Sequence, residues 1–322
     1  MVETETKPFD EAAFSEFVDA QIQPIFDAFQ VERAKAFARL RLFGAIGLVV
    51  GAGVGGWLYI QQPKIWPLSI VMVLVFGVLG MIPGWTRLAA AKESFGAAHI
   101  GKIAKFMGLK HTAEGFEPPR FDDYNTIGLV PVGDRRRFSN LVTGTHKGTP
   151  FTIYEAKVEE RRTRTTTDKD GNTRTETYWE VVFHGQLLHT PIARKFACTT
   201  VIARDLGWLN TKGRFGKTMK PMGLADPHFE KLFEVYTTDQ VEGRYLVDPI
   251  FMTRLLTLED NHKKRKITAA FYQQSVLVAL QGGTSFFGTL GKKSNARSLA
   301  DDTVSAFRRI FDFLDMLKGK GR

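Results

Sequence analysis

Two long runs of apolar residues dominate the hydrophobic pattern of the first third of the chain. Residues 42–60 read LFGAIGLVVGAGVGGWLYI, residues 65–85 read IWPLSIVMVLVFGVLGMIPGW, and neither run contains a charged residue. As a helix rising about 1.5 Å per residue, the first run spans roughly 28 Å, which matches the hydrocarbon core of a bilayer. The pattern predicts a transmembrane helical hairpin over residues 42–85. The alternative is a buried hairpin of a soluble protein, which two uncharged runs of this length disfavour.

Basic residues predict the orientation of this hairpin. They gather on both outer flanks, whereas the connecting loop, QQPK, contains only Lys64. Because loops rich in Lys and Arg stay in the cytoplasm, both termini are expected there, at the bacterial inner membrane. Neither run resembles a cleavable signal, since the first begins only at residue 42, behind an acidic segment. The flanking basic residues are Arg33, Lys35, Arg39, Arg41, Arg87 and Lys92.

Glycines recur at a spacing of four along both runs. Gly47, Gly51 and Gly55 form one series, and Gly80 and Gly84 repeat the spacing. A face of small residues lets a second helix approach closely in lipid, so these glycines are candidate helix-packing positions. The packing partner is either the other run of the same hairpin or a second copy of the chain, which would make a homo-oligomer. The stretch GAGVGG also fits a G-x-G-x-x-G dinucleotide fingerprint, but it lacks the strand, amphipathic helix and acid that this fingerprint requires.

The segments on either side of the hairpin are predicted to be helical. Residues 1–41 carry phenylalanines at intervals of mostly three to five residues among acids, which indicates an amphipathic cytoplasmic segment with a break near Pro24. Because an acidic face is repelled by anionic lipid, membrane-surface binding is the weaker alternative for this segment. Residues 86–114 are predicted to continue from the second span as a helical stalk.

The pattern changes to strands in residues 115–322. Turn-forming GFEPPRFDDYN opens this part, and two alternating β-branched runs then flank Asp170-Gly171-Asn172, a strong hairpin signal. Helices are expected after the Asp248-Pro249 pair and over residues 298–317, where apolar residues form one stripe. The prediction is therefore an α+β fold, with a mixed and mainly antiparallel sheet and helices. Further strands are expected at residues 197–204, 233–236, 266–272 and 276–280.

Composition excludes several classes of protein. The chain of 322 residues has a formal net charge of +10, although its first segment is acidic. Cys198 is the only cysteine, which excludes an intrachain disulfide framework and multi-cysteine zinc or iron–sulfur sites. Because 43% of the residues are hydrophobic, disorder throughout the chain is also excluded. We expect no metal and no cofactor.

Motifs that resemble nucleotide or catalytic sites are incomplete. GTLGKKS lacks the first glycine and the final hydroxyl residue of a phosphate loop, and GGTSFFG lacks the last glycine of a nucleophile elbow. His184 and His189 are five residues apart in a predicted strand, so their side chains point to opposite faces and do not share a metal. Cys198, inside FACTTVIA, is predicted to be a small buried apolar residue rather than a nucleophile.

A dispersed polar site is the remaining enzyme alternative, and it would make the protein a membrane-tethered hydrolase or transferase. The non-catalytic interpretations of its members are a helix N-cap at Asp239 and a surface ion pair between Glu242 and Arg244. Whether the chain is an enzyme stays open, with a non-enzyme favoured. The members would be Glu155, Asp239, Arg244 and Tyr245.

Basic residues gather at the tip of the predicted hairpin and again at residues 263–266. Such clusters attract nucleic acid, but no recognition helix or RNP-type aromatic motif accompanies them, so nucleic acid is the least favoured partner. Beside an anionic leaflet each well-placed Lys or Arg gains about 1 kcal/mol, which favours contact with anionic lipid or an acidic protein partner. The alternative is that these basic side chains are exposed to solvent and bind no partner. The candidate contact residues are Arg161, Arg162, Arg164 and Arg174.

Three segments of the chain resemble one protein family. They are GTHKGTPFTIYEAKV at residues 144–158, VVFHGQLL at 181–188 and FEVYTTDQVEGRYLVDP at 233–249. The family is the uncharacterised bacterial domain of unknown function 3137, and the resemblance extends over most of residues 30–285. It implies a short membrane hairpin followed by a mixed strand–helix cytoplasmic domain, and it transfers no catalytic or ligand residues. The expected protein is an integral inner-membrane protein whose cytoplasmic domain is an interaction or lipid-contact module.

Overall fold

The computed structural model describes residues 5–7, 9–167, 173–204, 218–261, 266–282 and 295–318. It divides into two compact units. One contains residues 10–102 and 290–300, and we call it the helical unit. The other contains residues 1–9, 103–289 and 301–322, and we call it the sheet unit.

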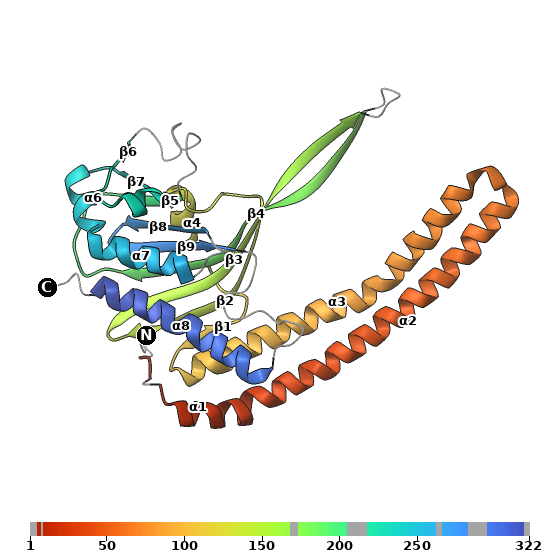
Figure 1. The fold of residues 1–322 in the computed structure, drawn as a ribbon, viewed down its shortest axis with the longest axis horizontal. Helices are drawn as coiled ribbons and strands as arrows, with labels where there is room; N and C mark the ends of the chain where they lie inside the picture. The colour runs from red at the N-terminus through yellow and green to blue at the C-terminus, as the bar shows by residue number, and fades with distance from the viewer. Residues whose placement is uncertain are drawn as a thin grey trace. The chain divides into compact units, whose positions relative to one another are not determined.

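The helical unit consists mainly of two long helices, α2 (Gln23–Gln61) and α3 (Trp66–Phe106), shown in Figure 1. A short helix, α1 (Glu11–Phe17), and a π-helical turn, Val18–Ile22, lead directly into α2. Next to Pro24, where a break is predicted, the π-helical turn ends and α2 begins, with Pro24 in the first turn of α2. Both α2, with the helical turns before it, and α3 are long and apolar enough to cross a membrane.

Glycines bring the backbones of α2 and α3 close together. A Cβ atom added at Gly47 would lie 2.2 Å from the carbonyl oxygen of Phe76, and one added at Gly80 would lie 2.2 Å from the carbonyl oxygen of Phe43. By contrast, a Cβ at Gly53 would meet nothing within 4 Å. Whether the hairpin depends on the glycines stays a prediction. An added Cβ would also be close to the other helix at the remaining candidate glycines. The distance would be 2.7 Å from Gly51 to Val73 Cα, 2.7 Å from Gly55 to the Ser69 carbonyl oxygen and 2.6 Å from Gly84 to Leu40 Cβ.

Among its described residues, the sheet unit contains nine strands in the order β1-β2-β3-β4-β9-β8-β5-β7-β6, and all neighbours pair antiparallel. Together with its helices, this sheet confirms the predicted α+β fold. β1 occupies the end of the predicted stalk, residues 86–114, so that segment is helical only to Phe106. The strands are β1 (Lys110–Thr112), β2 (Arg135–His146), β3 (Thr149–Thr167), β4 (Thr173–Pro191), β5 (Thr200–Arg204), β6 (Lys220–Pro221), β7 (Phe233–Thr237), β8 (Lys266–Tyr272) and β9 (Ser275–Gln281).

Alternation of apolar residues along the central strands buries one large cluster that includes Tyr154, Phe183 and Leu187. On the sheet-unit part of α8, Phe311 stacks on His146 at 4.4 Å between ring centroids and meets the edge of Phe151. The predicted strand at 197–204 begins only at Thr200, whereas those at 233–236, 266–272 and 276–280 lie within β7, β8 and β9. The helices are α4 (Phe121–Thr126), α5 (Pro227–Glu230), α6 (Gln240–Leu246), α7 (Pro249–Asn261) and α8 (Ala296–Lys318).

Candidate functional site

The β3–β4 hairpin continues beyond the rest of the sheet as a two-stranded ribbon (Figure 1). β2 pairs with β3 only as far as Glu159, and β9 pairs with β4 only from Gly185 onward. We call residues 160–167 and 173–180 the ribbon. Within the described part of the chain, these residues pair as strands only with each other, so the outer edge of each strand lies beside no further strand. The predicted Asp170-Gly171-Asn172 turn lies outside the described residues.

The pairing register divides the ribbon's side chains into two faces. Residues opposite each other in an antiparallel pair point to the same face, and the faces alternate along each strand. On one face Arg161 lies opposite Trp179, and threonine pairs follow further out. We call it the threonine face; its threonine pairs are Thr163–Thr177, Thr165–Thr175 and Thr167–Thr173. We call the other the charged face; its pairs are Glu160–Glu180, Arg162–Tyr178, Arg164–Glu176 and Thr166–Arg174.

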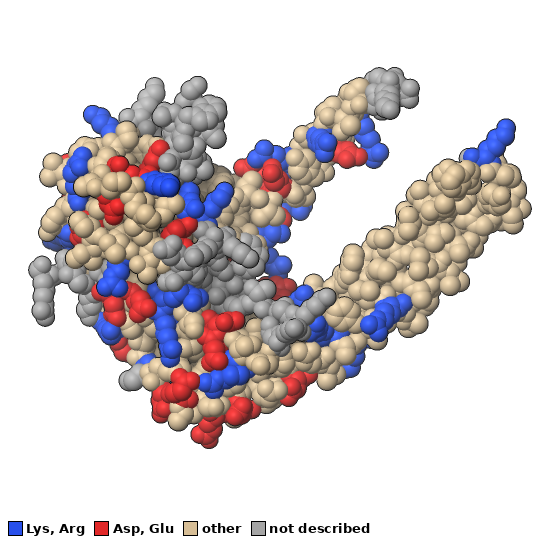
Figure 2. Space-filling model, viewed as in Figure 1, with Lys and Arg blue, Asp and Glu red and all other residues tan. Residues whose placement is uncertain are grey.

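Acidic residues offset most of the basic charge of the ribbon, whose two strands carry four arginines and three glutamates. Residues 160–180 contain five Lys or Arg and five Asp or Glu, so their formal charges cancel. Arg162 forms ion pairs with Glu160 at 3.0 Å and with Glu180 at 2.7 Å. Arg174 pairs with Glu176 at 3.1 Å. Figure 2 accordingly shows acidic and basic side chains side by side on the ribbon.

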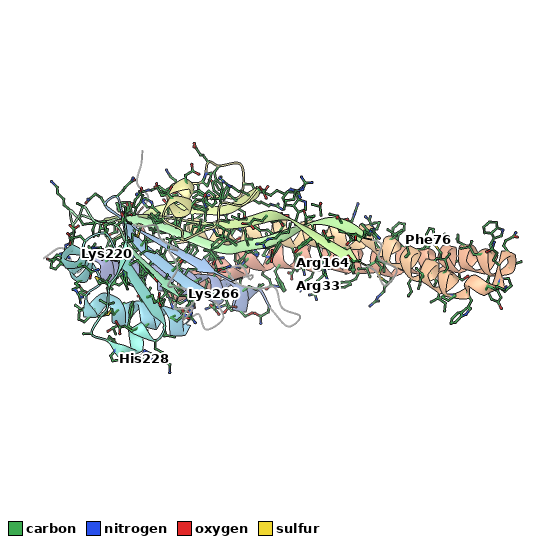
Figure 3. All side chains as sticks on the ribbon, turned by 90° about the horizontal axis from the view of Figure 1, so that it is seen from above. Arg33, Phe76, Arg164, Lys220, His228 and Lys266 are labelled. Atoms are coloured by element: carbon green, nitrogen blue, oxygen red, sulfur yellow. The ribbon has the colours of Figure 1, made fainter. Side chains whose placement is uncertain are left out.

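The four candidate contact arginines lie on different faces of the ribbon. Arg161 belongs to the threonine face, whereas Arg162, Arg164 and Arg174 belong to the charged face. Arg164 is labelled on the ribbon in Figure 3. All four side chains are exposed, so they are accessible to a partner. A contact role for them stays a prediction.

Aromatic side chains are exposed at the base of the ribbon. Tyr178 is 46% exposed and Trp179 is 37% exposed. The guanidinium of Arg135, on β2, lies 3.5 Å from the ring centroid of Trp179. A half-exposed aromatic ring beneath a cation can contribute to binding energy when a partner covers it.

A second polar site surrounds Arg120, at the start of α4. Its guanidinium donates to the Asp123 carboxylate at 2.5 Å, to Ser275 Oγ at 2.7 Å and to Gln273 Oε1 at 2.9 Å. His189 Nε2 lies 3.5 Å from Arg120 Nη1 and 3.2 Å from Ser275 Oγ. The cluster therefore joins α4, β4 and the turn between β8 and β9. Because all three guanidinium nitrogens already have partners, Arg120 holds the fold together rather than presenting a free cation.

Backbone conformation marks this cluster as unusual. Arg120 has a φ of 56°, and Gln273 and Gln274, in the turn between β8 and β9, have φ values of 46° and 58°. Residues with a side chain rarely adopt this left-handed conformation. The hydrogen bonds explain why it persists: Arg120 holds Gln273, and the Gln274 side-chain amide bonds both the carbonyl oxygen and the N–H of Phe196.

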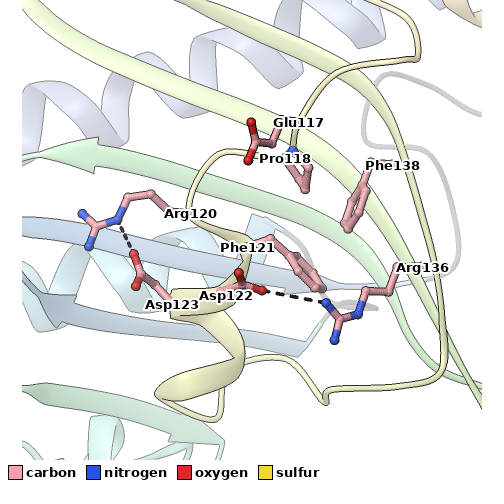
Figure 4. A pocket seen from close by; sticks show the side chains of 8 residues that line it. All are labelled: Glu117, Pro118, Arg120, Phe121, Asp122, Asp123, Arg136 and Phe138. Atoms are coloured by element: carbon pink, nitrogen blue, oxygen red, sulfur yellow. Dashed lines mark hydrogen bonds and ion pairs between the residues drawn. The ribbon is translucent and has the colours of Figure 1, made fainter.

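A pocket of about 290 Å³ lies beside the Arg120 cluster (Figure 4). Acids and bases alternate on its wall, and two ion pairs join them: Arg120 with Asp123, and Arg136 with Asp122 at 3.8 Å. Mixed charges of this kind favour no single ligand class. The lining residues are Glu117, Pro118, Arg120, Phe121, Asp122, Asp123, Arg136 and Phe138.

The residues of the predicted dispersed site serve separate structural contacts. Glu155 accepts a hydrogen bond from Asn140, and Asp239 accepts from the N–H groups of Val241 and Glu242 as the N-cap of α6. Glu155 is on β3 and Asp239 follows β7, five strand positions away in the sheet order. At about 4.8 Å per strand, this separation exceeds the reach of any shared site.

The remaining members of that site also have local roles. Arg244 donates to the carbonyl oxygen of Gly223 at 2.9 Å, and the Tyr245 ring lies under the guanidinium of Arg194. The predicted Glu242–Arg244 surface pair is replaced by a different contact, because the Glu242 carboxylate accepts from the N–H groups of Ala197 and Cys198.

The other candidate residues lie apart from the ribbon and the pocket. Cys198 is buried, and burial raises the pKa of its thiol. His189 and His184 occupy opposite faces of β4 by their spacing. Among the described residues, no group of three or more His, Cys, Asp or Glu side chains is arranged to hold a metal. GTLGKKS, most of GGTSFFG and residues 263–265 of the second basic cluster lie outside the described residues.

Comparisons with known proteins bear on the sheet unit. Residues 181–318 match the family model described as "Protein of unknown function (DUF3137)". This region of the chain belongs to the DUF3137 family. The DUF3137 region begins in β4 and reaches the end of α8, and it contains two of the three segments that carry the resemblance, 181–188 and 233–249.

One solved structure is similar to the chain. It is the crystal structure of the mycobacterial trehalose monomycolate transport factor A, TtfA, with 15% sequence identity and a TM-score of 0.37. The alignment covers 69% of this chain and 95% of that chain. At this TM-score the likeness carries no argument about function. No curated protein matches this chain.

Proposed function

We propose that this chain is an integral protein of the bacterial inner membrane whose sheet unit lies in the cytoplasm as an interaction module. The helical hairpin carries the first part of the proposal. Large apolar side chains are exposed along both uncharged runs, from Leu42 to Trp85. Figure 2 shows the outer part of the hairpin as a surface without charged side chains, except for the basic group at its end. Leaving such a surface in water costs about 25 cal/mol per Å². A bilayer removes that cost, and the length of each helix is sufficient to cross one.

The orientation follows from the basic residues beside the spans. Six Lys or Arg lie within the segments 33–41 and 87–92, whereas the loop between the helices contains only Lys64. This asymmetry supports cytoplasmic termini and a loop on the periplasmic side. Fusions of a reporter that is active only in the periplasm test it: a fusion at Arg322 should be inactive and a fusion at Gln62 active. The reverse pattern would overturn the proposed topology, and activity at neither position would overturn membrane insertion.

The ribbon is the surface that we assign to partner contact. It is exposed, it carries open strand edges, and exposed aromatic rings lie at its base. Because three glutamates offset its four arginines, attraction to an anionic leaflet is weak, and a protein partner is favoured over lipid. Open edges bind proteins by addition of a strand, in which main-chain hydrogen bonds provide affinity and side chains provide specificity.

Photo-crosslinking of the full chain in cells tests this assignment. A photoreactive amino acid is placed at Thr163 or Thr177 on the ribbon, and at His228, an exposed residue of α5, as the matched control. We expect protein adducts from both ribbon positions and none from position 228. Lipid adducts, or equal labelling from all three positions, would contradict a protein-binding role for the ribbon.

A further inference from the structure

The ribbon's open edges require a structural explanation. A two-stranded hairpin on its own is at best marginally stable in water, and an uncovered edge strand is a site for pairing with another chain. On β3 the edge is closed at the base, where the Asp134 carboxylate accepts the N–H of Arg161 at 2.8 Å. For residues 173–180 of β4, no described group bonds to the outer edge in this way.

We infer that the outer edge of β4 pairs antiparallel with the same edge of a second copy of this chain, centred on Thr175. In that two-fold register Thr175 faces Thr175 of the other copy, and Arg174 faces Glu176. The two Arg–Glu contacts are equivalent by symmetry, as an isologous interface requires. Opposite charges placed directly across an antiparallel pair stabilise it.

The register also matches the two faces of the ribbon. Joining two β4 edges gives a four-stranded sheet, in which the threonine pairs of both copies form one continuous surface. On the charged face, the row through the centre reads Arg164, Glu176, Arg174 of the second copy and Thr166 of the second copy. Glu176 in this row therefore lies between two bases.

Other edge pairings fit less well. Registers of β3 with itself centred on Arg162, Thr163 or Arg164 set arginine against arginine. A register of β4 centred on Thr177 also matches charges, because Arg174 then faces Glu180. Glu180, however, already forms an ion pair with Arg162 at 2.7 Å. The ion pair of Glu176 is with Arg174 of its own strand, and that arginine side chain is more exposed, so this pair exchanges for the contact between copies more easily. The charges therefore favour Thr175 as the centre.

This inference rests on the proposed function, because anchoring both copies in one membrane raises their effective concentration at a weak strand edge. Disulfide trapping in native membranes tests it. The only natural cysteine, Cys198, is first changed to alanine, and Thr175→Cys is then introduced. Directly opposed residues in an antiparallel pair have Cα atoms about 4.5 to 5.5 Å apart, which suits a disulfide. Mild oxidation should give a covalent species of twice the chain's mass.

Thr165→Cys is the matched control on the same face. In the inferred four-stranded sheet it lies three strand spacings, or about 14 Å, from its symmetry mate, too far for a disulfide. Equal trapping at positions 165 and 175 would indicate random collision, and trapping at Thr177→Cys instead of Thr175→Cys would overturn the register. A trapped species of a different mass would overturn the second copy as partner while leaving the proposed interaction module intact.

Charge reversal tests the register independently. In the Thr175→Cys background, Arg174→Glu or Glu176→Arg sets like charges together at two symmetric positions, and about tenfold less trapped dimer is expected. The double variant Arg174→Glu/Glu176→Arg restores opposite charges and should restore trapping. Unchanged trapping in the single variants, or no recovery in the double variant, would overturn the inference. An unchanged melting temperature in all three variants would show that the sheet unit itself remains folded.

Discussion

Gly47 and the carbonyl oxygen of Phe76 are so close that an added Cβ would lie 2.2 Å from the oxygen. The contact is between backbones, since glycine has no side chain and the carbonyl belongs to the main chain of α3. No rotamer change can relieve it. Larger residues at Gly47 therefore require the helices themselves to move apart.

We predict that Gly47→Ala destabilises the helical hairpin by about 1 to 3 kcal/mol, because overpacking displaces one helix from the other. Gly53→Ala is the matched control, since a Cβ there would meet nothing within 4 Å on the same helix. Thermal unfolding of the full chain in detergent measures the effect. Equal melting temperatures for the two variants would mean that the helices are not held by this contact.

Arg120 is expected to stabilise the sheet unit through its hydrogen bonds rather than through its charge alone. Arg120→Lys keeps the charge but cannot reach Asp123, Ser275 and Gln273 together, so we expect a loss of about 2 to 3 kcal/mol in unfolding free energy. Arg137→Lys is the control, because Arg137 is 61% exposed in its ion pair with Glu114. Chemical denaturation of both variants compares them, and similar losses would argue against a special role for the Arg120 cluster.

The stability of the sheet unit should fall in mild acid because of His189. Burial, and to a lesser extent the charge of Arg120, lowers the pKa of His189 from 6.5 to about 4. The unfolded chain therefore binds a proton that the folded chain does not, and stability decreases as pH falls from 6.5 towards 4. Each proton contributes a slope of up to about 1.4 kcal/mol per pH unit.

The variant His189→Gln tests this pH dependence. Denaturation of the full chain at several pH values between 4.5 and 7 should give a shallower slope for the variant than for the natural protein. His99, whose pKa burial also lowers to about 4, remains in both proteins and contributes equally to both slopes. Parallel slopes would mean that His189 takes up its proton without loss of structure.

Variants of Asp239 test whether this residue has a structural role as the N-cap of α6. Its carboxylate oxygen accepts from the N–H groups of Val241 and Glu242, both at 2.9 Å. Asp239→Ala should cost about 1 kcal/mol, whereas Asp239→Asn keeps an accepting oxygen and should cost a few tenths at most. Denaturation of the two variants measures the difference. Equal losses would contradict the N-cap interpretation.

Several structural features could be predicted from local sequence because their causes are local. The strands β8 and β9 follow from β-branched and apolar residues on either side of a two-residue link, and α7 follows from the Asp248-Pro249 start, whose aspartate caps Phe251. The near balance of charge on the ribbon is also local, because Glu160, Glu176 and Glu180 lie on the same two strands as its four arginines.

The Arg120 cluster could not be predicted in this way. Its members come from three separate stretches of the sequence: residues 120 and 123, residue 189, and residues 273 and 275. No motif joins these stretches, because the sheet order brings β4 beside β9 through pairings that depend on the whole fold. The left-handed conformation of Arg120 is likewise invisible in sequence, since that conformation typically favours glycine or asparagine.

The sequence by itself determined the features that depend on runs and periods: two uncharged stretches long enough to cross a membrane, glycines at a spacing of four, and a strand-rich part with a long hairpin. Burial, helix propensity and turn formation act over a few residues, so the sequence is sufficient for them. Only the tertiary structure decided where β2 and β9 stop pairing, and therefore which residues form an open ribbon. It also decided which side chains share a face, because the pairing register, and not the spacing along one strand, sets which residues lie opposite one another.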